Sequence, residues 1–353
     1  MKKVFAKLKK DKVPFFAFCV LFALYFLILF ADFFALYPSS YSNRKMAYQP
    51  PNNIYIITPE NKLSKPYTYN YIKSFNKDSF SIEYKQDRSK KYYIKFLSKG
   101  FEYKLFGLFK TNIHFLSVDK ECNFHLLGTD INGCDVFSRL FYGGQISLTI
   151  GFLALLISFP IGAIYGGISG YLGGKTDKVL MRIAEGIMSV PSFYLLIILA
   201  SILPSGMTSL QRFALITAIL ALIGWAGFSR VIRGMVLSIK NQDYVKAIET
   251  IGASKKRIIL KHILPQTSSY VIIAITLSVP SYILAESGLS FLGLGIQLPD
   301  ASWGNMLKEA QEFANILYRP WLLTPGFLIF IAVLSFNVLG DKIRDILDPK
   351  TIK

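Results

Sequence analysis

The stretch DYVKAIETIGASKKRIILKHILP, residues 243–265, is a polar and basic segment between two long apolar runs. In its first half, Tyr244, Ile248 and Ile251 fall on one stripe at helical spacing, which predicts an amphipathic helix. Gly252 suits the left-handed backbone position that commonly ends a helix. An ordered polar segment of this length is costly unless another surface covers it.

The second half of the stretch predicts another short helix. Ser254 can cap its start, and basic side chains follow as far as Lys261. Pro265 is expected to end it, because proline lacks the amide hydrogen that a helix needs. Such a helix either docks on a protein partner or lies on an anionic lipid surface. The residues alone leave both interpretations open.

The composition of the chain separates apolar from charged residues. Its 353 residues have a mean hydropathy of +0.39, with 52% hydrophobic and 18% charged residues. Crossing a membrane takes about 20 apolar residues, and six runs approach or exceed that length. They are Phe15–Leu36, Ile146–Ile168, Gly186–Leu203, Phe213–Phe228, Ser269–Leu289 and Trp321–Leu339.

The positions of the basic residues predict the orientation of these spans. Lysines and arginines cluster before the first span, between the fourth and fifth spans, and after the sixth. Cytoplasmic flanks carry such an excess, so both termini are expected in the cytoplasm. The net charge of +18 therefore reflects topology and a lysine-rich outer segment. Nucleic-acid binding is a poor interpretation, because the basic residues flank spans instead of forming one groove.

The spans divide the chain into four predicted parts. Residues 1–37 form a cytoplasmic end and the first span, and residues 38–144 an extracytoplasmic insert. Residues 145–340 form a five-span core with a cytoplasmic loop at 230–267, and residues 341–353 a cytoplasmic tail. The fold class is thus an all-α membrane protein of six spans with a small β-rich insert. Alternating runs around Ser98-Lys99-Gly100 predict a hairpin that turns there.

Small and reactive residues add further expectations. Gly162, Gly166 and Gly170 recur every fourth residue, which predicts close helix packing in lipid. Outside the membrane, Cys122 and Cys134 could form a disulfide, with two unpaired thiols as the alternative. Histidines stand too far apart in sequence to indicate a metal site. Near the outer end of the fifth span, Glu286 is interpreted as a hydrogen-bonded structural acid, with a proton relay as the alternative.

The layout of residues 243–265 resembles the coupling loop of ATP-binding-cassette (ABC) importer permeases. That family's pattern runs from Glu-Ala-Ala through a glycine to Ile-x-Leu-Pro, and the chain keeps the glycine-to-proline spacing. Lys246 stands where the family has glutamate, and His262 where it has isoleucine. The resemblance implies that this loop contacts an ATPase subunit. The residues it implies for that contact are Tyr244, Lys246, Ala247, Ile248, Gly252, Ala253, His262 and Pro265.

Three further segments resemble the dipeptide and oligopeptide branch of that family. They are GTDINGCDVFSRLFYGGQISLTIG (residues 128–151), ESGLSFLGLGIQLPDASWGNML (286–307) and LGDKIRDILDPK (339–350). The first lacks two arginines that the family usually has, at Cys134 and Gln145, and is interpreted as an interfacial elbow. The family residues kept in this elbow are Gly128, Asp130, Asp135, Ser138 and Arg139.

Taken together, the motifs identify the chain as a member of a family of ABC importer permease subunits, most similar to those for di- and oligopeptides. The resemblance implies a second permease subunit, two ATPase subunits and an extracytoplasmic binding protein as partners, in the bacterial inner membrane. No phosphate-binding loop or nucleophile motif is present, so this chain is not expected to be an enzyme. It should hold no cofactor, with ATP and Mg²⁺ bound by the partners.

Two other functions are considered beside this one. Within the same family, nickel or another small solute is an alternative substrate. An ion-coupled secondary transporter is the alternative from another class, and it would favour matched broken helices in two halves, which the sequence lacks. An enzyme or structural protein that acts through the outer insert is a further alternative, but that insert carries no catalytic constellation.

Overall fold

A computed structural model describes residues 7–77, 81–119, 121–204 and 206–347. The chain divides into two compact units, which are described separately. Unit 1 comprises Met1–Phe22, Leu148–Leu289 and Phe330–Lys353, and unit 2 comprises Ala23–Ser147 and Ser290–Ile329. The insert therefore shares its unit with the loop that precedes the last helix. The predicted ends of the chain, at 1–6 and 348–353, lie outside the described residues, as does the last part of the 339–350 motif.

Long apolar helices confirm the predicted fold class. Among the described residues, five runs are long and apolar enough to cross a membrane, and there are six if a bent pair of shorter helices counts as one span. The five are α2 (Lys12–Leu29), α4 (Val136–Leu172), α7 (Ser209–Ile239), the run Lys255–Phe291 that ends in α10 (Ser268–Phe291), and the run Pro320–Leu347 that ends in α13 (Thr324–Leu347).

The third predicted span, Gly186–Leu203, is not one straight helix. Helix α5 (Gly174–Met188) and helix α6 (Ser192–Ser201) meet at an angle of 78°. Pro191 is the residue before α6 and has extended backbone angles. Because proline has no amide hydrogen and disfavours helix in the residue before it, the path breaks there.

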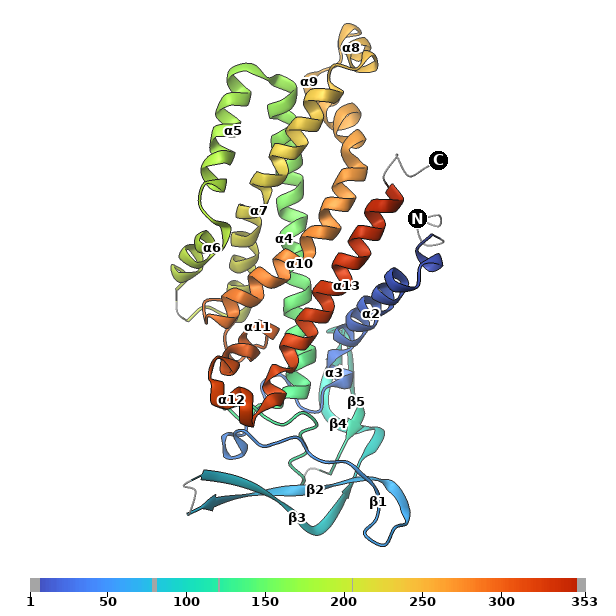
Figure 1. Ribbon diagram of the computed structural model, residues 1–353, viewed down its shortest axis with the longest axis vertical. Helices are drawn as coiled ribbons and strands as arrows, with labels where there is room; N and C mark the ends of the chain where they lie inside the picture. The colour runs from blue at the N-terminus through green and yellow to red at the C-terminus, as the bar shows by residue number, and fades with distance from the viewer. Residues whose placement is uncertain (1–6, 78–80, 120, 205, 348–353) are drawn as a thin grey trace. The chain divides into compact units, whose positions relative to one another are not determined.

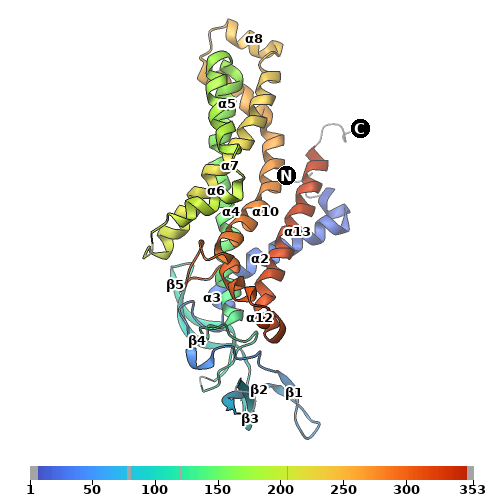
Figure 2. The same ribbon diagram turned by 60° about the vertical axis from the view of Figure 1, so that its left-hand side comes forward.

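In unit 1, the three spaced glycines pack closely against a neighbouring helix, as predicted, and that helix is α7. A Cβ atom at Gly162 would lie 2.8 Å from the carbonyl oxygen of Trp225, and one at Gly166 would lie 2.3 Å from that of Ser229. One turn further, a Cβ at Gly170 would lie 2.8 Å from the carbonyl oxygen of Arg233. The two helices run side by side in both views (Figures 1 and 2). Any larger side chain on this stripe would separate them.

Two antiparallel sheets in unit 2 form the predicted β-rich insert (Figure 1). Strands β1 (Tyr55–Ile57), β2 (Leu63–Asn76) and β3 (Ser81–Tyr93) make one sheet, and β4 (Lys95–Leu105) and β5 (Phe109–Ser117) make the other. Tyrosine side chains on β2 are buried, and the rings of Tyr67 and Tyr69 meet edge to face at 5.6 Å. Aromatic contacts of this kind stabilise a small sheet core.

The hairpin turn predicted at Ser98-Lys99-Gly100 is wrong. Residues 95–105 form the single strand β4, and the chain turns later, at residues 106–108. The pairing with β5 shifts register between Lys99 and Tyr103, which marks an irregularity in the strand. Gly100 lies inside that irregularity, where a Cβ atom would come within 2.5 Å of the His114 ring. Glycine here permits a close approach, which the sequence signal of a turn resembles.

Short helices complete unit 2 around one buried tryptophan. They are α3 (Ala31–Phe34), η1 (Arg44–Met46), α11 (Trp303–Met306), η4 (Leu307–Gln311), α12 (Phe313–Tyr318) and η5 (Pro320–Leu323). Trp303 is 1% exposed, and its indole nitrogen donates to the carbonyl oxygen of Leu140 at 2.9 Å. Gly143 and Gly144 leave room for the ring, since a Cβ on either would approach it within 3.3 Å. The motifs at residues 128–151 and 286–307 therefore pack against each other.

Candidate functional site

Residues 243–267, called here the 243–267 segment, begin with α8 (Asp243–Thr250), which is amphipathic as predicted but turned differently. Its buried residue is Val245, which is fully inaccessible, and Ile248 is half-buried. The predicted stripe residues Tyr244 and Ile251 are 37% and 83% exposed. An isoleucine exposed to this degree beside exposed Lys246 makes a mixed apolar and basic surface. Such a surface is typical of a contact site for another protein.

The turn after α8 has the geometry that its sequence predicts. Gly252 has φ +80°, and its amide donates to the carbonyl oxygen of Glu249 at 3.0 Å. The next amide, of Ala253, returns to Ile248 at 3.3 Å, so the exposed carbonyls at the helix end are used. Ser254 then caps the following turn by accepting from the amide of Arg257. No other group of the described residues lies within 4 Å of a Cβ built on Gly252, so this turn is open on its outer side.

Pro265 does not end the second helix as predicted. The chain continues through α9 (Lys255–Arg257), the π-helix η2 (Ile258–Ile263) and the 3₁₀-helix η3 (Leu264–Thr267) directly into α10. Proline is tolerated at the start of a helical turn, and it occupies that position in η3. The backbone widens to a π-helix before Pro265 and tightens to a 3₁₀-helix around it. These changes accommodate the hydrogen bond that proline cannot donate. His262 is half-buried in this run and Pro265 is exposed.

Polar contacts that the sequence did not predict tie the 243–267 segment to the helices of unit 1. The hydroxyl of Tyr171, at the end of α4, donates to Glu249 in α8 at 2.7 Å. Just before the segment, Lys240 at the end of α7 donates to the carbonyl oxygen of Gly170 in α4 at 3.0 Å. These residues are 78 and 70 positions apart. No local pattern could have indicated them.

A half-buried ion pair lies close to these contacts. Arg233 in α7 binds Asp177 in α5 through two nitrogens, at 2.6 Å and 2.5 Å, and Ser169 of α4 donates to the same carboxylate at 2.5 Å. Bidentate arginine pairs of this geometry are strong and directional. Three helices are thereby joined at one level, close to the residues that hold α8.

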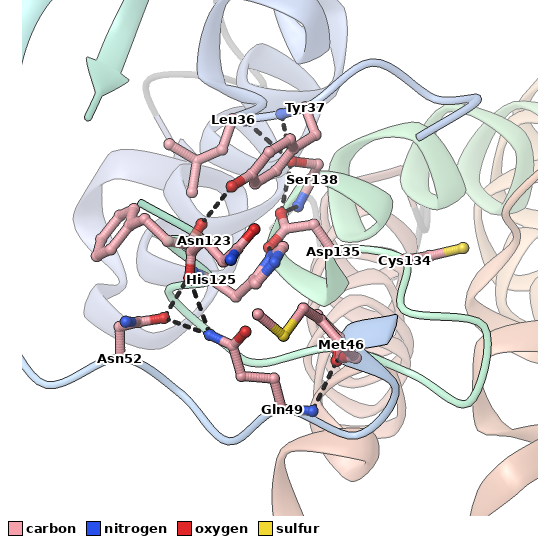
Figure 3. Close-up of polar contacts among 12 residues, drawn as sticks. Leu36, Tyr37, Met46, Gln49, Asn52, Asn123, His125, Cys134, Asp135 and Ser138 are labelled. Atoms are coloured by element: carbon pink, nitrogen blue, oxygen red, sulfur yellow. Dashed lines mark hydrogen bonds and ion pairs between the residues drawn. The ribbon is translucent and has the colours of Figure 1, made fainter. Parts of the chain in front are cut away.

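Residues 128–139, called here the 128–139 loop, lead into α4 and include its first turn. They hold a network of hydrogen bonds centred on Asp135 (Figure 3). Asp135 is 2% exposed and is the residue before α4. Its carboxylate accepts from the amide and the hydroxyl of Ser138, at 2.7 Å and 2.6 Å, as an N-terminal helix cap. It also accepts from Nδ1 of His125 at 2.8 Å, so the ring proton is on that nitrogen.

Ser138 and Tyr37 extend the network to the chain that leaves the first span. The Ser138 hydroxyl oxygen accepts from the amides of Leu36 and Tyr37, at 2.9 Å and 3.0 Å. The Tyr37 ring stacks on His125 with 4.9 Å between the ring centres (Figure 3). The family residues in this loop therefore join two spans at their ends. Neither His125 nor Tyr37 was singled out from the sequence.

Asp130 and Arg139 are buried together, whereas the interpretation of this loop as an interfacial elbow places Arg139 at the lipid headgroups. Asp130 accepts from the amides of Asn132 and Cys134 at 2.8 Å, and its second oxygen lies 3.7 Å from Arg139. Burial raises the pKa of Asp130, and the charge of Arg139 opposes that rise. Burial, together with the nearby Asp130 carboxylate, also raises the pKa of Glu309 to about 7. Glu309 accepts from the amide of Ile131 at 3.1 Å.

Gly128 occupies a position that only glycine fits. It has φ +71°, and a Cβ there would lie 2.6 Å from the carbonyl oxygen of Gln49. The neighbouring Thr129 carbonyl accepts from the indole of Trp321 at 3.1 Å. Each of the five family residues in this loop thus has a contact within unit 2 that accounts for it.

The disulfide considered between Cys122 and Cys134 is absent, because both are free, buried thiols. Cys122 packs in an apolar cluster with Ile94 and Phe124, whereas Cys134 lies in the loop around Asp130. Burial raises the pKa of the Cys122 thiol to about 12. A thiol that stays protonated is a poor nucleophile for disulfide formation.

Each unit contains a cavity that could receive a ligand or a partner's side chain. In unit 2, a cavity of about 680 Å³ is lined by polar groups that include Asp130, Arg139 and Glu309. In unit 1, a cavity of about 470 Å³ is mostly apolar, with Ser278, Ser281 and Tyr282 among its lining residues. Glu286, which directly follows the lining residue Ala285, is fully buried, with the Ser287 hydroxyl 3.5 Å from its carboxylate.

Comparison with known proteins defines the class of this chain. Residues 158–353 match the family described as binding-protein-dependent transport system inner membrane component, and residues 1–51 match the N-terminal TM domain of oligopeptide transport permease C. The chain therefore belongs to the family of binding-protein-dependent inner-membrane transport components, as a permease and not as the ATPase. Membership implies a binding protein and an ATPase as partners, and it confirms the resemblance drawn from the motifs.

Individual relatives narrow the similarity within that family. The dipeptide transport system permease protein DppC of Bacillus subtilis is 46% identical over 64% of this chain and 69% of its own length. The oligopeptide transport system permease proteins OppC of Bacillus subtilis and Haemophilus influenzae are 43% and 42% identical. Their alignments cover 65% and 64% of this chain, and 73% and 71% of those proteins.

Proposed function

We propose that this permease imports di- or oligopeptides that an extracytoplasmic binding protein delivers. The proposal rests on the relatives, whose names specify dipeptide and oligopeptide transport. It also rests on the candidate membrane spans of the chain, which suit a helix bundle that lines a path. A second permease subunit would complete the path, and two ATPase subunits would bind ATP and Mg²⁺. Both termini would lie in the cytoplasm, in accord with the basic residues that flank the spans.

The exposed outer side of the 243–267 segment is the observation that carries the coupling part of this proposal. Val245 anchors α8, while Tyr244, Lys246, Ala247 and Gly252 are exposed, and Ile248 and Ala253 are half-buried. A segment held at its base with its other face uncovered suits docking into a groove of an ATPase subunit. The segment would then be the place where ATPase closure acts on the spans.

The polar contacts at the base of α8 supply a route for that motion. Glu249 binds the end of α4, and the Arg233–Asp177 pair joins α7 to α5 beside it. A push on α8 would therefore move α4, α5 and α7 together instead of bending one helix. A conformational change of this kind requires that the ATPase contact one bundle state better than the other.

The residues that line the 470 Å³ cavity of unit 1 are candidates for the wall of the peptide path. Helices α4, α6, α7 and α10 contribute to its lining. Its apolar surface suits peptide side chains of varied size, and hydroxyls such as those of Ser278 and Ser281 can meet peptide backbone groups. A pocket of mostly apolar character with a few polar groups is typical of small-molecule sites.

Substitution of Gly252 tests the coupling role without disturbing the fold. Gly252→Asp places a negative charge on the open turn, and Gly252→Asn places a neutral side chain of the same shape there. Both residues tolerate the left-handed conformation. Peptide uptake should be lost in Gly252→Asp, with membrane protein at the wild-type level, and largely kept in Gly252→Asn. Normal uptake by Gly252→Asp would overturn the coupling role.

A transport assay tests the substrate. The chain is purified with its co-expressed subunits and placed in liposomes, and uptake of labelled dipeptides and longer peptides is measured with ATP inside. Import that needs the binding protein and ATP supports the proposal. ATP-driven import of a metal ion or an unrelated solute, without peptide import, would contradict it.

A further inference from the structure

The turn between β4 and β5 presents a group of exposed apolar side chains. Phe106, Leu108 and Phe109 are 52%, 77% and 67% exposed, and only Gly107 separates the first two. This group, Phe106 with Leu108 and Phe109, is called the hairpin tip. Scattered exposed apolar residues need no explanation, but three large ones together at the end of a hairpin mark a surface that something covers.

Contacts within unit 2 show where the hairpin tip lies along the chain that leaves the membrane. At the base of the hairpin, Nδ1 of His114 lies 3.1 Å from the carbonyl oxygen of Ala35. Also near the base, the ring of Phe115 packs on that of Phe34 at 5.5 Å. At the tip, the ring of Phe106 meets that of Phe30 at 5.4 Å.

The order of these contacts gives the direction of the hairpin. Its base lies beside residue 35, its tip lies beside residue 30, and the apolar span α2 ends at residue 29. The hairpin thus runs back toward the membrane. The 18 residues of α2 extend about 27 Å, close to the hydrocarbon thickness of roughly 30 Å. Phe30 and the hairpin tip therefore stand at the edge of the hydrocarbon layer.

Two lysines lie directly behind the hairpin tip. Lys104 and Lys110 are exposed and face each other as cross-strand partners, next to the pair Leu105 and Phe109. Like charges in opposing positions destabilise a sheet. Among the described residues, neither lysine forms an ion pair. An external anion at the level of the lipid headgroups would offset this repulsion.

We propose that the β4–β5 hairpin is a membrane anchor of the insert, with a lipid bilayer as its partner. The hairpin tip enters the boundary of the hydrocarbon layer beside Phe30, in the leaflet on the insert's side. Lys104 and Lys110 bind lipid phosphates above it. Apolar burial and attraction to anionic lipid act together in such interfacial elements. The inference concerns the insert alone and does not depend on the transported solute.

Depth-dependent quenching tests the anchor in the complete chain. Cys19 is replaced by serine, since Cys122 and Cys134 are buried, and an environment-sensitive fluorophore is attached to Leu108→Cys. The matched control is Leu63→Cys, a leucine that is 89% exposed at the start of β2. Both proteins are placed in lipid nanodiscs that contain lipids spin-labelled near the headgroup end of the acyl chain.

The expected result is a blue-shifted emission at position 108 and at least a twofold stronger quenching than at position 63. Equal quenching at the two positions would overturn the proposal, and so would protection of position 108 only after binding protein is added. Lys104→Gln with Lys110→Gln should reduce the quenching at position 108 in nanodiscs rich in anionic lipid. Unchanged quenching at position 108 would contradict the role proposed for the two lysines.

Discussion

Two motif regions of the same chain, the 243–267 segment and the 128–139 loop, use their recognisable residues in opposite ways. In the 243–267 segment, the motif residues are mostly exposed, and a Cβ at Gly252 would meet nothing within 4 Å. In the 128–139 loop, Asp135 and Ser138 are both 2% exposed and Arg139 is 6% exposed. The motif of the first region leaves its residues uncovered within this chain, where we propose that a partner docks, whereas the motif of the second region is part of the chain's own architecture.

That difference predicts which substitutions will damage folding and which will damage transport. Changes in the 128–139 loop should act on the stability of the protein, and changes in the 243–267 segment should act on its activity. The following substitutions test that distinction, and their expected effects on stability decrease in the order given.

Asp135→Ala should have the largest effect. It removes the cap of α4 and leaves the Nδ1 proton of His125 and the Ser138 hydroxyl without their carboxylate. Losing one member of a buried charged network typically costs about 3–5 kcal/mol. The measurement is the unfolding free energy of the detergent-purified protein. Asp119→Ala, at an exposed ion pair with Lys95, is the control and should cost under about 1 kcal/mol. Equal losses would contradict the comparison.

Two left-handed glycines form a second test, because one is enclosed and the other is open. Gly133 and Gly252 have φ +69° and +80°. A Cβ on Gly133 would lie 1.9 Å from the carbonyl oxygen of Asn43, so Gly133→Ala adds a backbone displacement to the conformational strain. We expect a loss of about 2–4 kcal/mol for Gly133→Ala and about 1 kcal/mol for Gly252→Ala. Similar melting temperatures for the two variants would show that enclosure does not matter.

Glu309 should give the stability of unit 2 a dependence on pH. Its pKa is about 7 in the folded protein, against 4.5 without the burial. The folded state therefore binds this proton more tightly, and the unfolding free energy falls as pH rises from about 4.5 through 7. Glu309→Gln should flatten this fall by about 1–2 kcal/mol, allowing for partial solvent exposure. The measurement is the melting temperature across that range, with exposed Glu102→Gln retaining the wild-type slope. A steeper fall in Glu309→Gln would refute the assignment.

Lys246→Glu should have the smallest effect on stability. Lys246 is exposed in α8, and substitutions at such positions usually change stability by less than about 0.5 kcal/mol. The substitution restores the glutamate that the family pattern has, so any consequence should appear in the rate of peptide uptake. Melting temperature and uptake are measured on the same preparation. A lower melting temperature with unchanged uptake would place Lys246 in the architecture instead of on the docking surface.

Periodicity predicted the elements of this fold better than their ends. The spans and the contact of Gly166 with α7 followed from local patterns, because apolar length and small-residue spacing act within one helix. The predicted span Gly186–Leu203 is broken at Pro191, and the turn predicted at Gly100 is an irregularity within a strand. Proline and glycine mark an irregular backbone, but packing decides whether the result is a turn, a bend or a continuing helix.

Sequence by itself determined the class of fold, the family, the left-handed turn at Gly252 and the cap at Ser254, because each depends on a few neighbouring residues. Tertiary structure alone decided that Val245 is the anchor of α8, that Asp177 pairs with Arg233, and that Glu309 meets the 128–139 loop. The last two contacts join residues 56 and 178 positions apart. The physical reason is that burial and charge pairing depend on which surfaces come into contact, and the spacing of residues in the sequence does not specify those contacts.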